Sequence, residues 1–387
     1  RQVTKLYGTK PRIYDRFHGD DDSSSSSSCQ AFQNLEHPAE HTMAIAGIFH
    51  SGHQLLTQLL FKNCHMPEYV QKYNHGFVGN NNNNGIRWQV PWGKNNPPGN
   101  ETFRKTHSVR SYFNLTASNA EMMDNHANYV FPVLSIKDPY RWMQQMCQKP
   151  MSARWKNRQS FLNEDHCPNL INNDNDDNDN DNNSSSSSYP VTVNYNVFKR
   201  QHDSLVHFYN DWFNEYKDIT IPRLIVRYED LLFHPQAVTT QICECAGGQM
   251  NHHHGGENDN NDNNNNSKNF VYIKQFNEEQ KKIYIDEIIR YGKNDRHRYY
   301  GFEKQDLDYT NRHLDTNLME IFDYKYANNF LYDSTHDDDT TNNNNNGDNE
   351  DKKPILNLLI DSGVKFLDED RYRNLPTWSK VSDLYYG

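Results

Sequence analysis

The sequence has few hydrophobic residues and no long hydrophobic run. Only 34% of its 387 residues are hydrophobic. No stretch reaches the roughly 18 consecutive apolar residues that a membrane-spanning helix needs. The chain as given therefore contains no predicted transmembrane segment. Residue 1 is Arg rather than Met, so we expect an incomplete N-terminus, which leaves room for a membrane anchor or a signal before it.

The net charge of the whole chain is -11, but most of the chain has no excess of acidic residues. Low-complexity tracts of Asn, Asp and Ser hold seventeen acidic residues and no Lys or Arg, which leaves a net charge of +6 for the remainder. The tracts lie at about 20–28, 80–84, 172–188, 251–267 and 336–351. Because they cannot bury apolar surface, we predict disordered surface insertions there. A mildly basic body suits an anionic ligand.

Zinc-ligand spacing is also absent among the cysteines, so we predict no metal site. The six are Cys29, Cys64, Cys147, Cys167, Cys243 and Cys245. Cys147 and Cys167 flank a polar stretch, and the sequence leaves open whether they form a disulfide or remain two buried thiols. The even cysteine count and the glycosylation sequons at Asn100 and Asn114 favour the secretory pathway, with the Golgi lumen as the expected compartment and the cytoplasm as the alternative.

Apolar strand patterns alternate with helical patterns along the chain. Buried strands are predicted within 42–49, 129–136 and 223–227, and the spacing of apolar residues predicts helices at 53–63, 197–217 and 277–292. Pro139 marks the start of another helix. This alternation indicates an α/β fold with a central parallel sheet and crossover helices.

The first strand and helix enclose a glycine loop without the usual lysine. Gly47 and Gly52 have the G-x-x-x-x-G spacing of a phosphate-binding loop, but His53 and Gln54 stand where Lys and Ser/Thr normally follow. Backbone amides at the helix start, with Ser51 and His50, still suit one phosphate better than a triphosphate. The alternative is an ordinary tight turn from strand to helix.

Two further segments place cations at predicted strand ends. In "RKTHSV", Lys105 and His107 are two residues apart, so an ammonium and an imidazole point the same way in an extended chain. One can stabilise negative charge while the other accepts a proton. In "SIKDPYRW", Lys137 precedes a helix start, where a second anion can dock. The alternatives are a basic surface loop and a simple helix start at Asp138 and Pro139.

These motifs, in this order and followed by "HFYNDWFNEY" and "VRYEDLLFHP", resemble the sulfotransferase family that uses 3'-phosphoadenosine-5'-phosphosulfate (PAPS). The resemblance covers roughly residues 42–65, 103–108, 130–150, 200–250 and, weakly, 275–330. It implies a P-loop-like, three-layer α/β domain with a central parallel sheet flanked by helices. The chain is similar to a divergent member with low-complexity insertions.

The resemblance also implies roles for individual residues. His50, Ser51, Gly52, His53 and Gln54 would bind the 5'-phosphosulfate end of PAPS. His107 would be the general base and Lys105 its neighbouring cation, with His50 as a third catalytic group. Lys137 and Gln145 would hold the 3'-phosphate, and Arg227 to Asp230 would be mostly structural. No metal would be required.

The chain departs from the family pattern at these positions. The family has Lys at the position of His50, Thr at that of His53, Arg at that of Lys137 and Ser at that of Gln145. Each replacement keeps a donor, but lysine lacks the bidentate fork of arginine, and a neutral imidazole is a weaker clamp than an ammonium. An adjacent anion would raise the pKa of such an imidazole.

We therefore expect transfer of a sulfuryl group from PAPS to a hydroxyl acceptor, preferentially a carbohydrate, with adenosine 3',5'-bisphosphate as the product and no nucleic-acid partner. The alternatives are a non-catalytic nucleotide or glycan binder of the same fold and, less favoured, a P-loop kinase. The expected organisation is a poorly ordered lead at 1–40, the α/β domain at 41–332, a linker at 333–353, and a C-terminal helix and tail at 354–387.

Overall fold

Buried, largely apolar segments form a five-stranded central sheet. The computed structural model describes residues 2–18, 25–73, 84–98, 129–155, 170, 188–195, 198–251, 270–271, 276–292 and 298–327. Across the sheet the strand order is β1 (Ile13–Tyr14), β11 (Leu224–Arg227), β7 (Val130–Ile136), β4 (Thr42–Ala46) and β6 (Ile86–Arg87). All neighbours are parallel except β1, which is antiparallel to β11. The predicted α/β class is confirmed, with a mostly parallel sheet.

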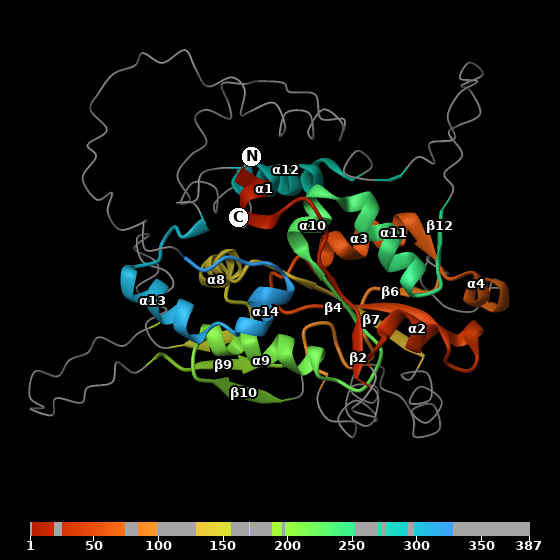
Figure 1. Cartoon of the computed structure of the whole chain (residues 1–387), viewed down its shortest axis with the longest axis horizontal. Coiled ribbons are helices and arrows are strands. Elements are labelled where there is room, and N and C mark those ends of the chain that lie inside the picture. The colour runs from red at the N-terminus through yellow and green to blue at the C-terminus, as the bar shows by residue number, and fades with distance from the viewer. Residues whose placement is uncertain are drawn as a thin grey trace, which may run out of the picture.

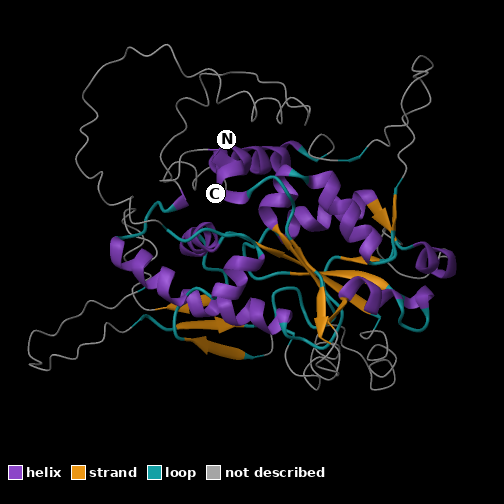
Figure 2. Cartoon of the chain, viewed as in Figure 1, coloured by secondary structure: helices purple, strands orange, loops and turns teal. Residues whose placement is uncertain are grey.

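Helices cover both faces of this sheet. Every residue of β4, β7 and β11 is buried, as expected for parallel strands packed on both sides. Figures 1 and 2 show α3 (His53–Asn63), α11 (Pro235–Cys245) and α12 (Glu278–Gly292) above the strands, and α9 (Leu205–Lys217) and α14 (Thr316–Ile321) below them. The other α-helices of the described residues are α1 (Gln2–Tyr7), α2 (Ser28–Gln33), α4 (Pro67–Tyr73), α8 (Pro139–Gln148), α10 (Tyr228–Phe233) and α13 (Lys304–His313).

The helices that the sequence predicts near the glycine loop are confirmed. Helix α3 has the predicted bounds of 53–63. Helix α8 begins at Pro139, and Asp138 caps it by accepting hydrogen bonds from the Tyr140 and Arg141 amides. In α12 the side chain of Asn277 accepts from the Gln280 amide at 2.8 Å, which fixes the predicted start of that helix.

Smaller sheets lie outside the predicted pattern. One of their strands replaces the start of the helix predicted at 197–217, since residues 199–202 form a strand and α9 begins only at Leu205. Strands β8 (Ala153–Trp155), β9 (Val191–Asn194) and β10 (Lys199–His202) form an antiparallel sheet, shown below α9 in Figure 1. Two-stranded sheets join β2 (Arg16–His18) to β3 (Ser25–Ser27) and β5 (Cys64–His65) to β12 (Gln249–Met250). Such two- to four-residue strands are too short to show a clear period in the sequence.

The N-terminal segment contributes to the main sheet, whereas the sequence led us to expect a poorly ordered lead over 1–40. Strand β1 pairs with β11. The Arg12 amide donates to the Asp230 carboxylate at 2.7 Å, and Arg227 donates to the Tyr7 carbonyl at 2.5 Å. These partners lie more than 200 residues away along the chain, so the order of this segment depends on contacts that a local pattern does not record.

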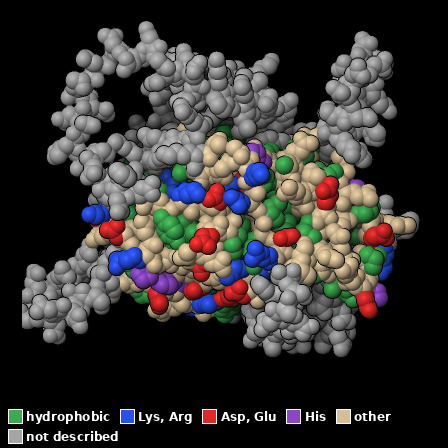
Figure 3. Space-filling model, in the orientation of Figure 1, with side chains coloured by type: hydrophobic (Ala, Val, Ile, Leu, Met, Phe, Trp, Pro, Cys, Tyr) green, Lys and Arg blue, Asp and Glu red, His purple; other side chains and the backbone are tan. Residues whose placement is uncertain are grey.

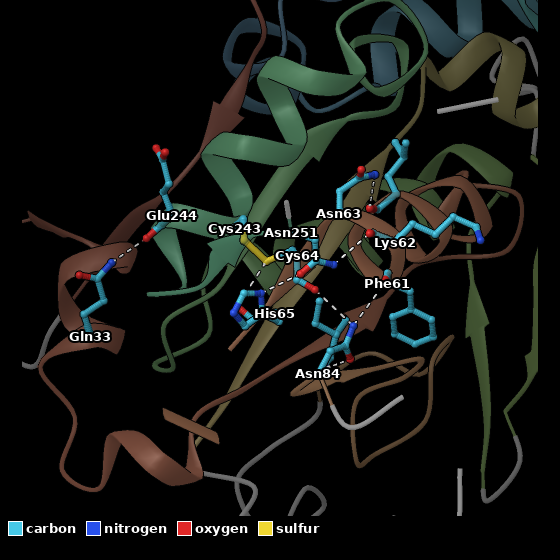
Figure 4. The surroundings of a disulfide bond; sticks show 12 residues. Gln33, Phe61, Lys62, Asn63, Cys64, His65, Asn84, Cys243, Glu244 and Asn251 are labelled. Carbon is cyan, nitrogen blue, oxygen red and sulfur yellow. Dashed lines mark hydrogen bonds between the residues drawn. A yellow bond between two sulfur atoms is a disulfide. The ribbon is translucent and has the colours of Figure 1, made fainter. Parts of the chain in front are cut away.

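Disulfides fasten α11 to two earlier parts of the chain. Cys29 of α2 pairs with Cys245, and Cys64 at the end of α3 pairs with Cys243. Around the second bond, Figure 4 shows Asn251 beside His65 and Asn84 beside Phe61 and Cys64. Cys147 is also disulfide-bonded. The thiol alternative for Cys147 is therefore wrong, while its proposed partner Cys167 lies outside the described residues.

Several predictions fall on residues that the structure does not describe. These are nearly all of the polar insertions, the linker at 333–353, the C-terminal helix and tail, and the sequons at Asn100 and Asn114. Among the described residues, no helix combines the length and apolar content needed to cross a bilayer. On the face shown in Figure 3, acidic and basic side chains are interspersed rather than gathered by sign.

Candidate functional site

The loop between β4 and α3 has a backbone shape that its glycines make possible. Gly52 is the N-cap of α3 and has φ of 89°, in the left-handed region that favours glycine. A Cβ on Gly52 would overlap the ring of Tyr228, and a Cβ on Gly47 would come within 2.6 Å of the Ser51 hydroxyl oxygen. His50 also has a positive φ, of 60°. The two glycines thus allow a tight loop with no side-chain cap on the amides of α3.

Hydrogen bonds from neighbouring elements hold this loop in place. The Gly47 amide donates to the Lys94 carbonyl at 2.9 Å. The Trp142 indole of α8 donates to the Phe49 carbonyl at 2.6 Å. The Ser51 side chain is fully buried, and its hydroxyl has no hydrogen-bond partner among the described residues. The loop therefore has fixed walls and one buried hydroxyl that its own fold does not use.

A cavity of about 370 Å³ opens beside the loop. It lies at the carboxyl ends of three adjacent parallel strands, because the loop follows β4, Lys137 follows β7 and Tyr228 follows β11. After β4 the chain continues to β6 on one side, whereas β7 lies on the other side and leads on to β11. Such a switch in strand order leaves a crevice that commonly binds ligands in open α/β sheets.

Residues from the loop, α8 and α12 line this cavity together. The lining comprises Phe49, His50, Gly52, His53, Gln54, Leu55, Asn95, Lys137, Gln145, Gln148, Lys149, Met151, Tyr228, Gln280, Ile283, Tyr284, Asp286, Glu287 and Arg290. Its ionisable side chains include three Lys or Arg and two Asp or Glu. The cavity is therefore polar and of mixed charge, with a volume in the usual range for small-molecule sites.

Lys137 is buried at the base of the cavity and is paired with Glu287. Its Nζ lies 3.0 Å and 3.2 Å from the two carboxylate oxygens of Glu287, and it donates to Gln145 Oε1 at 3.0 Å. The ammonium also lies 4.3 Å from the centre of the Tyr228 ring. Burial lowers the pKa of Lys137, and the adjacent carboxylate opposes that shift. Burial acts to raise the pKa of Glu287, but Lys137 and Arg290 bring it down to about 2, so this carboxylate is ionised.

Both loop histidines are neutral at physiological pH in this structure. Burial lowers the pKa of His50 to about 4, and Lys137 and Lys149 add to the shift. Burial lowers the pKa of His53 to about 3, followed by the positive charge of Lys94. His50 Nε2 lies 2.5 Å from the Lys149 carbonyl, which can only accept, so this nitrogen carries the proton. The Nδ1 of a neutral His50 is then a bare acceptor.

The structure brings together most of the residues that the sequence singled out. His50, Gly52, His53, Gln54, Lys137 and Gln145 line the cavity, with Ser51 buried in the loop beside them. Lys105 and His107 lie outside the described residues, so their predicted roles stay predictions. Within the described ranges there is no group of three His, Cys, Asp or Glu side chains that could hold a metal ion.

Three residues at or beside the cavity were not predicted from the sequence to contribute to the site. Tyr228 faces the cavity, although its neighbours Arg227 and Asp230 form a buried structural ion pair. Glu287 lies on the buried stripe of α12, three residues after Tyr284 and four before Tyr291. A carboxylate within an apolar stripe was a signal available in the sequence. Lys94 comes from the segment beside β4, and nothing local in its sequence relates it to the loop.

Comparison with known proteins does not identify a family for this chain. No protein-family model matches the chain, and no significant match was found among curated proteins or solved structures. The functional interpretation therefore depends on the motifs and on the geometry of the cavity.

Proposed function

We propose that this protein is a sulfotransferase that moves a sulfuryl group from PAPS to a hydroxyl acceptor, with carbohydrate as the favoured acceptor class. The supporting observation is that six predicted donor-binding residues, from segments up to 95 positions apart, line one cavity at the carboxyl ends of β4, β7 and β11. A P-loop-like fold belongs to the same proposal. The mostly parallel sheet and the glycine loop before α3 support it.

In this proposal the chain holds the donor through backbone amides and a few polar side chains. The uncapped first turn of α3 presents its N–H groups to the 5'-phosphosulfate end, with His53 and Gln54 beside them. Lys137 and Gln145, 3.0 Å apart, hold the 3'-phosphate. The buried hydroxyl of Ser51 is a further donor for the 5' end. Positioning of this kind lowers the barrier by holding the reacting groups in line.

The transfer itself requires a base and compensation of negative charge. As the acceptor oxygen attacks sulfur, a new S–O bond forms and the S–O bond to the 5'-phosphate breaks. His107 takes the acceptor proton, and adenosine 3',5'-bisphosphate leaves with the bonding electrons. Lys105 and a protonated His50 offset the charge on the bridging and leaving oxygens.

We propose the secretory pathway as the location of the protein, with the Golgi lumen as the expected compartment and the cytoplasm as the alternative. Two disulfides between distant segments and a third at Cys147 support an oxidising environment. The acceptor class is proposed from this compartment and from the half-exposed Trp88, whereas the nearby Trp92 is buried and does not support it.

One observation favours a second candidate, a binder of the same fold without turnover. Lys137 is already neutralised by Glu287, and both loop histidines are neutral, so none of the described residues to which the resemblance assigns a cationic role is a free strong cation. Such a protein would bind the nucleotide or a sulfated glycan without transferring a sulfuryl group.

Calorimetry and a transfer assay test the proposal in sequence. Adenosine 3',5'-bisphosphate should bind the purified full chain more tightly than ATP with magnesium, which a P-loop kinase would prefer. Labelled PAPS should then deliver sulfate to one member of a panel of glycans, phenols and steroids. Binding without transfer to any acceptor would favour the binder. No heat with the bisphosphate would refute the sulfotransferase and the nucleotide binder, and would leave only a binder of sulfated glycans.

A further inference from the structure

The carboxylate of Glu287 accepts four hydrogen bonds from the side chains of Lys137, Gln145 and Tyr228, which form the pocket around Lys137. Lys137 Nζ donates to both of its oxygens, Gln145 Nε2 donates to Oε1 at 2.6 Å, and the Tyr228 hydroxyl donates to Oε2 at 2.7 Å. Glu287 is 8% exposed, and the Lys137 side chain is 3% exposed. A buried carboxylate with this many donors is fully satisfied.

The three donors come from separate elements and together have the chemistry of an oxyanion site. Lys137 follows β7, Gln145 lies on α8 and Tyr228 begins α10. An ammonium, a primary amide and a phenol converge on a small volume, as they would around a phosphate or sulfate oxygen. In this structure α12 fills that volume with a carboxylate of its own.

Glu287 and an external anion cannot occupy this position together. Two like charges at contact distance in a buried site repel each other strongly, because little water screens them. Lys137 cannot move out of the pair by itself, because the buried carboxylate of Glu287 would then have no compensating charge. An anion can therefore bind here only if the Glu287 carboxylate moves out.

We propose that Glu287 is a built-in competitor that keeps the Lys137 pocket closed to anions until the ligand displaces it, so that α12 sets the affinity of the site. Arg290, one turn later on α12, lines the same cavity and offers the displaced carboxylate a nearby cation. The identity of the anion as the 3'-phosphate of PAPS rests on the proposed function. The competition itself rests only on the four contacts above.

The test compares the unmodified chain with Glu287→Gln and with Glu278→Gln as a matched control. Both changes remove one carboxylate from α12. Glu278, however, pairs with Lys281 and has a side chain that is 90% exposed, and it does not line the cavity. The glutamine at 287 keeps the size and an acceptor for Lys137 and Tyr228, but its neutral oxygen competes less strongly. By calorimetry, adenosine 3',5'-bisphosphate should bind Glu287→Gln at least about tenfold more tightly than the other two.

A second probe separates this inference from the proposed function. Inorganic pyrophosphate should raise the Tm of Glu287→Gln more than that of the unmodified chain or of Glu278→Gln. If the bisphosphate binds none of the three while pyrophosphate still distinguishes Glu287→Gln, the proposed function fails and the competition stands. Equal responses of all three proteins to both anions would overturn the competition.

A measurement on the unmodified chain covers the case in which Glu287→Gln does not fold. Displacement of Glu287 breaks its contacts with β7, α8 and α10, so the bound anion should increase hydrogen exchange of the amides between residues 283 and 291. Protection that stays unchanged or rises in this segment, with the anion bound, would contradict the displacement.

Discussion

The ring of Tyr228 lies against the Cα of Gly52, so close that a Cβ at that position would overlap the ring. This contact joins the start of α10 to the loop before α3. The same ring supports the Lys137 ammonium, and its hydroxyl holds Glu287. One aromatic side chain thus couples the glycine loop to the buried ion pair.

Gly52→Ala should therefore destabilise the protein more than a left-handed backbone alone explains. The positive φ costs about 1–2 kcal/mol for alanine, and displacement of the Tyr228 ring adds about 1–3 kcal/mol. Gly247→Ala is the matched control, because Gly247 has φ of 75° but its Cβ would meet only the Gln33 side chain at 3.6 Å. Denaturant unfolding measures both, and equal losses of unfolding free energy would show that the ring contact is unimportant.

His53 should make the free energy of unfolding decrease as the pH is lowered below about 6.5, the ordinary pKa of histidine. Its pKa in the folded protein is about 3, against 6.5 unfolded, so the unfolded chain binds the proton first. The stabilising contribution is complete above pH 6.5 and is lost as pH falls toward 3. Between pH 7 and pH 5, His53→Gln should lose roughly 1–2 kcal/mol less unfolding free energy than the unmodified chain.

The control for this measurement is His37→Asn. The His37 side chain is 66% exposed, and asparagine tolerates its left-handed backbone. This variant should follow the unmodified chain between the two pH values. A pH dependence in His53→Gln as steep as in the unmodified chain would contradict the assignment.

Much of the loop was predictable from sequence because its signals are local. The apolar run of β4, the two glycines and the leucine spacing of α3 lie within 20 residues, and the bounds of α3 were correct. The position of Lys137 at a predicted strand end identified it, whereas Gln145 was implied only by the resemblance. The convergence of these segments on one cavity was an expectation from the resemblance rather than from the pattern.

What escaped prediction depends on contacts between distant segments. Glu287 lies 150 residues beyond Lys137, and no period in α12 indicates which buried position faces the cation. The pairing of Cys29 with Cys245 spans 216 residues, so loop closure leaves no local signal. The order of β1 likewise follows from its pairing with β11.

The disulfide pairing should be uniquely set by α11. Residues two apart on a helix point about 200° apart, so Cys243 and Cys245 face opposite directions. Cys243 meets Cys64, and Cys245 meets Cys29. Non-reducing peptide mapping should recover these two pairs and neither exchanged pair, provided that the cleavage separates residues 243 and 245. Replacing Cys64 and Cys243 by alanine should cost about 2–5 kcal/mol of unfolding free energy.

Binding of adenosine 3',5'-bisphosphate should take up a proton if His50 contacts its anionic end. The Nε2–H of His50 is engaged with the Lys149 carbonyl, so the neutral ring offers an anion only the bare Nδ1. Protonation turns Nδ1 into a donor, and the bound anion raises a pKa that is otherwise about 4. Affinity should therefore rise as pH falls from 7 toward 5.

Calorimetry in two buffers of different ionisation enthalpy measures this uptake. The observed heat should differ between buffers for the unmodified chain and coincide for His50→Gln. Identical heats for the unmodified chain would mean that His50 stays neutral in the complex. It would then not supply the charge that the missing loop lysine leaves uncompensated.

Lys94 is the residue that we expect to replace that lysine in part. Its carbonyl holds the Gly47 amide, its charge lowers the pKa of His53, and its Nζ lies 5.5 Å from the centre of the Trp88 ring. Within the described residues no carboxylate forms an ion pair with it, and burial lowers its pKa to about 8. With that pKa Lys94 is still mostly protonated at neutral pH, and an anion bound at the loop would favour its charged form further.

Lys94→Met should therefore weaken binding of adenosine 3',5'-bisphosphate by about tenfold, because one charge-assisted contact is lost and the apolar stem is kept. The same change removes a positive charge beside His53, so the pKa of His53 should rise. NMR titration of the imidazole signals checks this second effect without any ligand. Neither lysine lines the cavity, but the charge of Lys94 acts on His53, whereas Lys10 is exposed and has no such effect, so Lys10→Met is the control. If Lys94→Met raised the His53 pKa but left the affinity unchanged, Lys94 would tune the loop electrostatically without contacting the anion, and the amides of α3 would carry the 5' end alone.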